Sequence, residues 1–115
     1  MLDYPISANR YWRNFKGRMV VSAEARQYKA IAALLWQSSG FPLHAGPVTV
    51  ELLLHPKQTQ SGDASKTRMD LDNVLKVAID ALNGVAFVDD KQVRKLVAEV
   101  ANPVPGGGLS VRVSA

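Results

Sequence analysis

One stretch decides how this chain folds: residues 70–84, which read DLDNVLKVAIDALNG. Its apolar residues recur at i, i+4, i+7, i+8 and i+11, the spacing of an amphipathic helix. They are Leu71, Leu75, Ala78, Ile79 and Leu82. Asn83-Gly84 is typical of a helix end, because both residues tolerate the backbone conformation found there. We therefore expect a helix up to residue 82 whose apolar stripe packs against the rest of the fold.

A second helix is predicted in the N-terminal half of the chain. Ser22 is a good N-cap, and Glu24 places a negative charge in the first turn, where the helix dipole favours it. Apolar residues follow at helical spacing, and Ser38-Ser39-Gly40 ends the pattern. Residues 1–21 are expected to form extended segments and turns with a basic, aromatic character.

Three strands are predicted, at residues 48–54, 93–100 and 109–113, from alternating or β-branched apolar residues. The connection over residues 102–108 is rich in Pro and Gly, so we expect the last two strands to form a loose hairpin. These elements indicate an α+β fold, in which a small mixed sheet of three or more strands packs against two helices. A single domain over residues 1–115 is expected from this length.

Charge points to a polyanionic partner. The formal net charge is +4 and the sequence pI is about 9.6. Residues 9–29 hold one acid, Glu24, against six basic residues: Arg10, Arg13, Lys16, Arg18, Arg26 and Lys29. A local positive field of this kind attracts nucleic acid. The chain has no cysteine and no apolar run long enough to span a bilayer, so we expect no membrane association and a cytoplasmic location.

Two pairs of carboxylates carry the chemistry. Asp70 and Asp72 fall at the start of the predicted helix, and Asp89-Asp90 precedes a predicted strand. Clustered carboxylates need a cation among them, which Lys76 or a divalent metal such as Mg²⁺ could supply. A basic chain with an acidic site suggests a phosphodiester held by basic residues and cut at a metal. The alternative, a helix cap and a solvated turn, stays open from the residues alone.

The run from Asp70 to Lys76, followed by Asp89-Asp90, resembles the RusA family of Holliday junction resolvases. The N-terminal stretch Pro5-Ile6-Ser7-Ala8-Asn9-Arg10-Tyr11-Trp12 is also similar. The resemblance implies a homodimeric, Mg²⁺-dependent endodeoxyribonuclease that resolves Holliday junctions by paired symmetric nicks, in DNA recombination and repair. It implies the catalytic residues Asp70, Asp72, Asp90 and Lys76, with the three aspartates as metal ligands. Whether Asp89 replaces Asp90 is left open.

Contacts to four-way DNA are expected from basic and polar residues at three places in the chain. The set is Arg10, Arg13, Lys16 and Arg18 near the N-terminus, Lys66 and Arg68 before the acidic run, and Asn73 within it. Tyr11, Trp12 and Phe15 could stack on unpaired bases, whereas Trp12 and Phe15 could instead be core or dimer-interface anchors. No nucleotide cofactor is expected, because residues 106–108 lack the lysine and helix of a phosphate loop.

Three other functions remain open at this point. The chain could be a broader nuclease acting on forks or flaps. It could also be a non-catalytic DNA-binding module whose acids are caps. The third is an interaction protein that dimerises through the apolar stripe of the helix beginning at Leu71.

Overall fold

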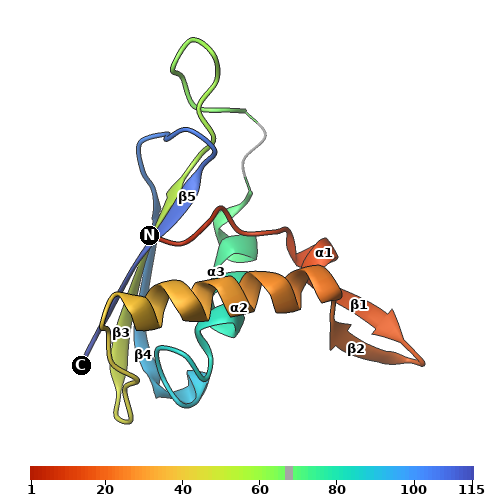
Figure 1. Ribbon diagram of the computed structural model, residues 1–115, viewed down its shortest axis with the longest axis vertical. Coiled ribbons are helices and arrows are strands. Elements are labelled where there is room, and N and C mark those ends of the chain that lie inside the picture. The colour runs from red at the N-terminus through yellow and green to blue at the C-terminus, as the bar shows by residue number, and fades with distance from the viewer. Residues whose placement is uncertain (67–68) are drawn as a thin grey trace.

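The computed structural model describes residues 1–66 and 69–115, apart from the side chains of residues 8 and 9. The elements in order are α1 (Ala8–Tyr11), β1 (Trp12–Phe15), β2 (Arg18–Val21), α2 (Ala23–Ser38), β3 (Val48–His55), α3 (Leu71–Leu82), the 3₁₀ turn η1 (Asp90–Gln92), β4 (Val93–Val100) and β5 (Gly108–Ser114). The two long helices cover one face of a three-stranded sheet (Figure 1). The predicted α+β architecture is therefore confirmed.

Both long helices begin and end where local signals predicted. The Ser22 Oγ accepts a hydrogen bond from the Ala25 N–H at 3.0 Å and caps α2. Asp70 is the N-cap residue of α3, and Asn83 is its C-cap. Gly84 follows at φ 79°, a left-handed conformation that glycine adopts without a steric penalty. In the part of the chain that the structure describes, no helix is long and apolar enough to cross a membrane.

The strand order is β4-β3-β5, with β3 parallel to β4 and antiparallel to β5. The predicted hairpin between the last two strands is therefore wrong. The connection between them crosses the end of β3, because the Ala101 N–H donates to the Leu54 carbonyl at 2.9 Å and the Val104 N–H to the Pro56 carbonyl at 3.1 Å. The most apolar strand thus takes the central place, where both of its edges are paired.

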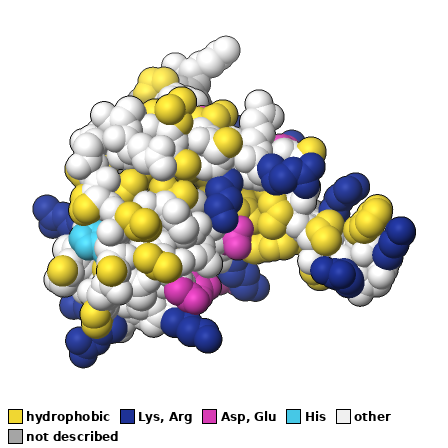
Figure 2. Space-filling model, turned by 60° about the horizontal axis from the view of Figure 1, so that its bottom comes forward, with side chains coloured by type: hydrophobic (Ala, Val, Ile, Leu, Met, Phe, Trp, Pro, Cys, Tyr) yellow, Lys and Arg dark blue, Asp and Glu magenta, His cyan; other side chains and the backbone are white. Residues whose placement is uncertain are grey.

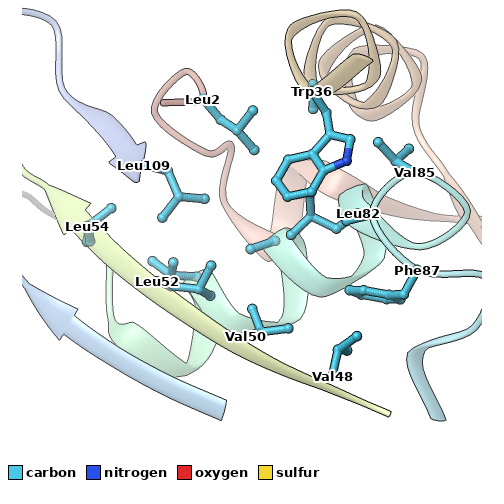
Figure 3. Packing of buried hydrophobic residues seen from close by; sticks show 14 residues of the cluster. Leu2, Trp36, Val48, Val50, Leu52, Leu54, Leu82, Val85, Phe87 and Leu109 are labelled. Atoms are coloured by element: carbon cyan, nitrogen blue, oxygen red, sulfur yellow. The ribbon is translucent and has the colours of Figure 1, made fainter. Parts of the chain in front are cut away.

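The main core lies between the sheet, α2 and α3 (Figure 3). Side chains of β3 meet Trp36 from α2 and Leu82 from α3 there. The Trp36 indole N–H, which would otherwise be buried without a partner, donates to the Pro42 carbonyl at 3.1 Å. Phe87 is 0% exposed, so this loop aromatic belongs to the core. Ala78 and Leu82 of the α3 stripe are fully buried in this core, whereas Leu71, Leu75 and Ile79 are half-buried against it.

The N-terminal region is more regular than predicted. It forms the short helix α1 and a hairpin of β1 and β2 that projects from the body (Figure 1). Lys16 and Gly17 both have positive φ, 51° and 78°. A two-residue turn of this kind matches the twist of the paired strands. The hairpin base rests on a second apolar cluster of Tyr11, Ala25, Tyr28, Val77 and Ala81.

Candidate active site

The first half of α3 presents the predicted polar residues to solvent. Asp70, Asp72 and Lys76 are all exposed. Asp70 has the extended backbone of an N-cap residue, with φ −68° and ψ 148°, but its carboxylate makes no capping hydrogen bond. The interpretation of Asp70 as a simple helix cap is therefore not supported. Free backbone N–H groups at this end of α3 favour negative charge nearby.

The second acidic pair divides into a structural residue and an available one. The Asp89 Oδ1 accepts a hydrogen bond from the Lys91 N–H at 3.0 Å, and the Asp89 N–H donates to the Gln92 Oε1 at 2.8 Å. This capping box starts η1. The Lys91 N–H is the largest cause of a lowered pKa at Asp89, followed by a hydrogen bond with the Asp90 side chain. Asp89 is thus engaged as a cap at the start of η1.

Asp90 and Lys76 line the same open depression, which we call the α3–β4 groove. Its volume is about 490 Å³. The lining residues are Trp12, Leu75, Lys76, Ile79, Asp80, Asp90 and Leu96. A second depression of about 310 Å³ shares Ile79, Asp90 and Leu96 with it and adds Val93, Arg94 and Lys95. The groove therefore combines an apolar floor with charges of both signs.

The structure does not bring all three predicted metal ligands together within one chain. Over residues 1–66 and 69–115, no three His, Asp or Glu side chains form a group that could hold a metal ion. Asp90 lies beside the second and third turns of α3, whereas Asp70 is the N-cap, about 9 Å along the helix axis from Lys76. Carboxylate oxygens suit Mg²⁺ in kind. One chain alone does not supply three of them at one point.

Asp80 also lines the groove, and its hydrogen-bond partner was not predicted from the sequence. The buried Tyr11 hydroxyl donates a hydrogen bond to the Asp80 Oδ2. Burial first, and then this hydrogen bond, raise the pKa of Tyr11 above its ordinary value, so the phenol stays protonated. The bond holds Asp80 at the groove edge, one helical turn after Lys76. That spacing of four was the available signal for Asp80, whereas nothing local indicated that Leu96 or Trp12 would line the groove.

The aromatic candidates for base stacking separate clearly. Tyr11 is 0% exposed and belongs to the core. Trp12 is half-buried in the groove wall, with its ring centroid 4.5 Å from that of Tyr11. Phe15 is 49% exposed near the hairpin tip. Phe15 is therefore the most exposed of these three rings.

The candidate DNA contacts also differ in availability. Arg13, Lys16 and Arg18 are exposed on the projecting hairpin, where dark-blue side chains gather at the right of Figure 2. Arg10 forms an ion pair with Glu24. The remaining candidates are the exposed Lys66, the half-buried Asn73, and Arg68, which lies outside the described residues.

Comparison with known proteins gives a consistent result. Residues 3–114 match the family described as Endodeoxyribonuclease RusA. A crossover junction endodeoxyribonuclease RusA of Escherichia coli strain K12 is 36% identical over 109 residues, covering 93% of this chain and 84% of that protein. The protein of that name from Enterobacteria phage 82 is 35% identical over 109 residues, and that from Shigella sonnei is 34% identical, both with the same coverage.

Proposed function

Because the chain belongs to the RusA endodeoxyribonuclease family, we propose that it is a crossover junction endodeoxyribonuclease that resolves four-way DNA junctions. The observation that carries this proposal is the α3–β4 groove, which both Lys76 and Asp90 line. The exposed basic hairpin begins at the same groove, because Trp12 lines it. A phosphodiester strand held by the hairpin would therefore lie next to these two side chains.

Lys76 is the residue proposed to stabilise the transition state. Its ammonium would lie against a phosphate in the groove and stabilise the additional negative charge that develops in the transition state of hydrolysis. Arg94 and Lys95 border the adjoining depression and add positive charge for the flanking phosphates. Leu75, Ile79 and Leu96 form the apolar part of the groove.

We retain Mg²⁺ as the proposed cofactor and Asp70, Asp72 and Asp90 as its proposed ligands. The support is their chemistry, since carboxylates are the hard oxygen donors that Mg²⁺ prefers, and the absence of a capping bond at Asp70. The carboxylates are not grouped in one chain. The ligand set therefore requires either a rearrangement or a residue from a second copy.

A homodimer fits the proposed substrate. A two-fold dimer presents two equivalent grooves, and a four-way junction itself has two-fold symmetry. Paired symmetric nicks are the expected outcome, because each groove would act on one of two equivalent strands. Sedimentation of the purified protein, alone and with junction DNA, measures this assembly directly.

The experiment is cleavage of an end-labelled four-way junction with Mg²⁺ or with chelator. The variants Asp70→Asn, Asp72→Asn, Asp90→Asn and Lys76→Met should lose cleavage while still binding the junction. Asp89→Asn is the matched control, because Asn can also cap a helix and should leave cleavage intact. Retained cleavage by all three of the other aspartate variants would rule out the assignment. Parallel reactions on fork, flap and linear duplex separate a resolvase from a broader branched-DNA nuclease.

A further inference from the structure

The β1–β2 hairpin has two different faces. In an antiparallel pair, directly opposed residues share a face. The register pairs Trp12 with Val21, and these two side chains pack against the second apolar cluster. The opposite face carries Arg13 and Phe15, with Arg18 directly across from Phe15. One face therefore anchors the hairpin, and the other presents an aromatic ring with two arginines. We call this second group the Arg13–Phe15–Arg18 face.

Phe15 on this face is exposed and surrounded by cations. The Arg13 guanidinium carbon lies 5.5 Å from the Phe15 ring centroid, and the Lys16 ammonium nitrogen lies 5.4 Å from it. The hairpin sequence, residues 12–21, contains no acidic residue. An apolar ring costs free energy in water unless it has a partner. The charges around it select a partner that offers both a flat apolar surface and negative charge.

Hydrogen bonds at both ends of the hairpin fix the backbone that carries Phe15. The Asn14 Oδ1 accepts a hydrogen bond from the Gly17 N–H at 3.1 Å, which braces the tip. At the base, the Ser22 N–H donates to the Tyr11 carbonyl at 2.8 Å, and the Ser22 Oγ donates to the Arg10 carbonyl at 2.7 Å. Phe15 follows Trp12 by three strand residues, so its backbone lies about 10 Å from that of the groove wall. DNA that extends from the groove past Trp12 and over the hairpin would therefore come within reach of the Arg13–Phe15–Arg18 face.

We propose that the Arg13–Phe15–Arg18 face stacks Phe15 on a nucleobase exposed at the branch point of the DNA, while its cations contact the flanking phosphates. This rests on the proposed function, and it names the side chains that select branched over linear DNA. A base in an intact duplex has no free π-face, whereas a base at a crossover can unstack at low cost. Phosphate contacts from Arg13, Lys16 and Arg18 would strengthen binding to any DNA. Phe15 would add affinity for the junction alone.

The test measures binding in chelator, so that cleavage does not interfere. The probes are a four-way junction carrying 2-aminopurine at positions next to the crossover and a linear duplex of the same arm sequence. We expect Phe15→Ala to weaken junction binding about 5- to 150-fold, the range reported by alanine substitution for one base–aromatic stack. Duplex affinity should change little, and the 2-aminopurine fluorescence gain should fall. Phe15→Trp should restore both signals.

Met19→Ala is the matched control, because Met19 is 68% exposed on the same hairpin but lies on the other face, opposite Asn14. It should bind as the parent protein does. Equal losses for Phe15→Ala and Met19→Ala, or an unchanged junction-to-duplex ratio for Phe15→Ala, would overturn the proposal. So would dissociation of a homodimer by Phe15→Ala in sedimentation, because the ring would then contact a second copy.

Failure of this proposal can be told apart from failure of the proposed function. If the parent protein cleaves junctions with Mg²⁺ but Phe15→Ala keeps full junction selectivity, only the stacking role is wrong. If the parent protein binds junctions through Phe15 but cleaves no DNA, the stacking role stands and the nuclease assignment fails. Melting temperatures of the variants, expected to match the parent because Phe15 is half-exposed, exclude unfolding as the cause.

Discussion

Replacing Tyr11 by Phe tests how the groove is held together. The ring of Tyr11 is fully buried, and its hydroxyl donates to the half-buried carboxylate of Asp80. Tyr11→Phe keeps the ring and removes only the donor. A hydrogen bond to a charged group contributes about 1.5–3 kcal/mol. Water can partly replace the hydroxyl at half-buried Asp80, so we expect a loss near the lower end, about 1.5 kcal/mol.

That loss corresponds to a fall in melting temperature of roughly 6 °C, taking about 4 °C per kcal/mol for a chain of this size. Tyr28→Phe is the matched control, because the Tyr28 hydroxyl donates to a neutral acceptor, the Asp3 carbonyl, at 2.7 Å. It should cost about half as much, since charge-assisted hydrogen bonds are about twice as strong as neutral ones. Denaturant unfolding at pH 7 measures both variants.

The alkaline limb gives an independent check. The pKa of Tyr11 is raised in the folded state, so its neutral form is favoured there. This stabilisation is fully present below the unfolded tyrosine pKa, and it is lost as pH rises through the higher folded value. Between these two values, Tyr11 should contribute a decline of roughly 1.4 kcal/mol per pH unit, which Tyr11→Phe removes. Equal stability of Tyr11→Phe and the parent at pH 7, with unchanged alkaline slopes, would refute the reasoning.

Two further predictions concern the core and the acidic cap. Phe87→Ala should destabilise the chain by about 3–5 kcal/mol, because it opens a cavity at a fully buried ring; a loss below about 1 kcal/mol in denaturant unfolding would contradict that packing role. Asp89→Ala should cleave junctions but flatten the acid limb of stability. Because the pKa of Asp89 is lower in the folded state, Asp89 stabilises the fold at pH values above its unfolded-state pKa. This stabilisation is lost as pH falls through the folded-state pKa. Thermal melts from pH 2 to 7 test it, and an unchanged acid limb would count against the capping role.

Local sequence signals were enough to predict where the two long helices form and which polar residues are candidates for the site. The apolar period of α3 and its Asn83-Gly84 end predict that helix, and the Ser22 cap predicts the start of α2, because each signal depends on neighbours within a few residues. The capping role of Asp89, which Asp90 does not share, was not predictable from the sequence, since the capping box depends on how the chain turns into β4.

Long-range packing decided the rest. The sheet order could not be obtained from the strand patterns, because β4 and β5 could pair with each other or with β3 equally well until burial of β3 selected the centre. The same packing put Lys76 and Asp90 on the lining of one groove, and it buried Tyr11 against Asp80 while leaving Phe15 exposed. Sequence spacing within one helix sets which residues share its surface. Only contacts between distant segments set what that surface faces.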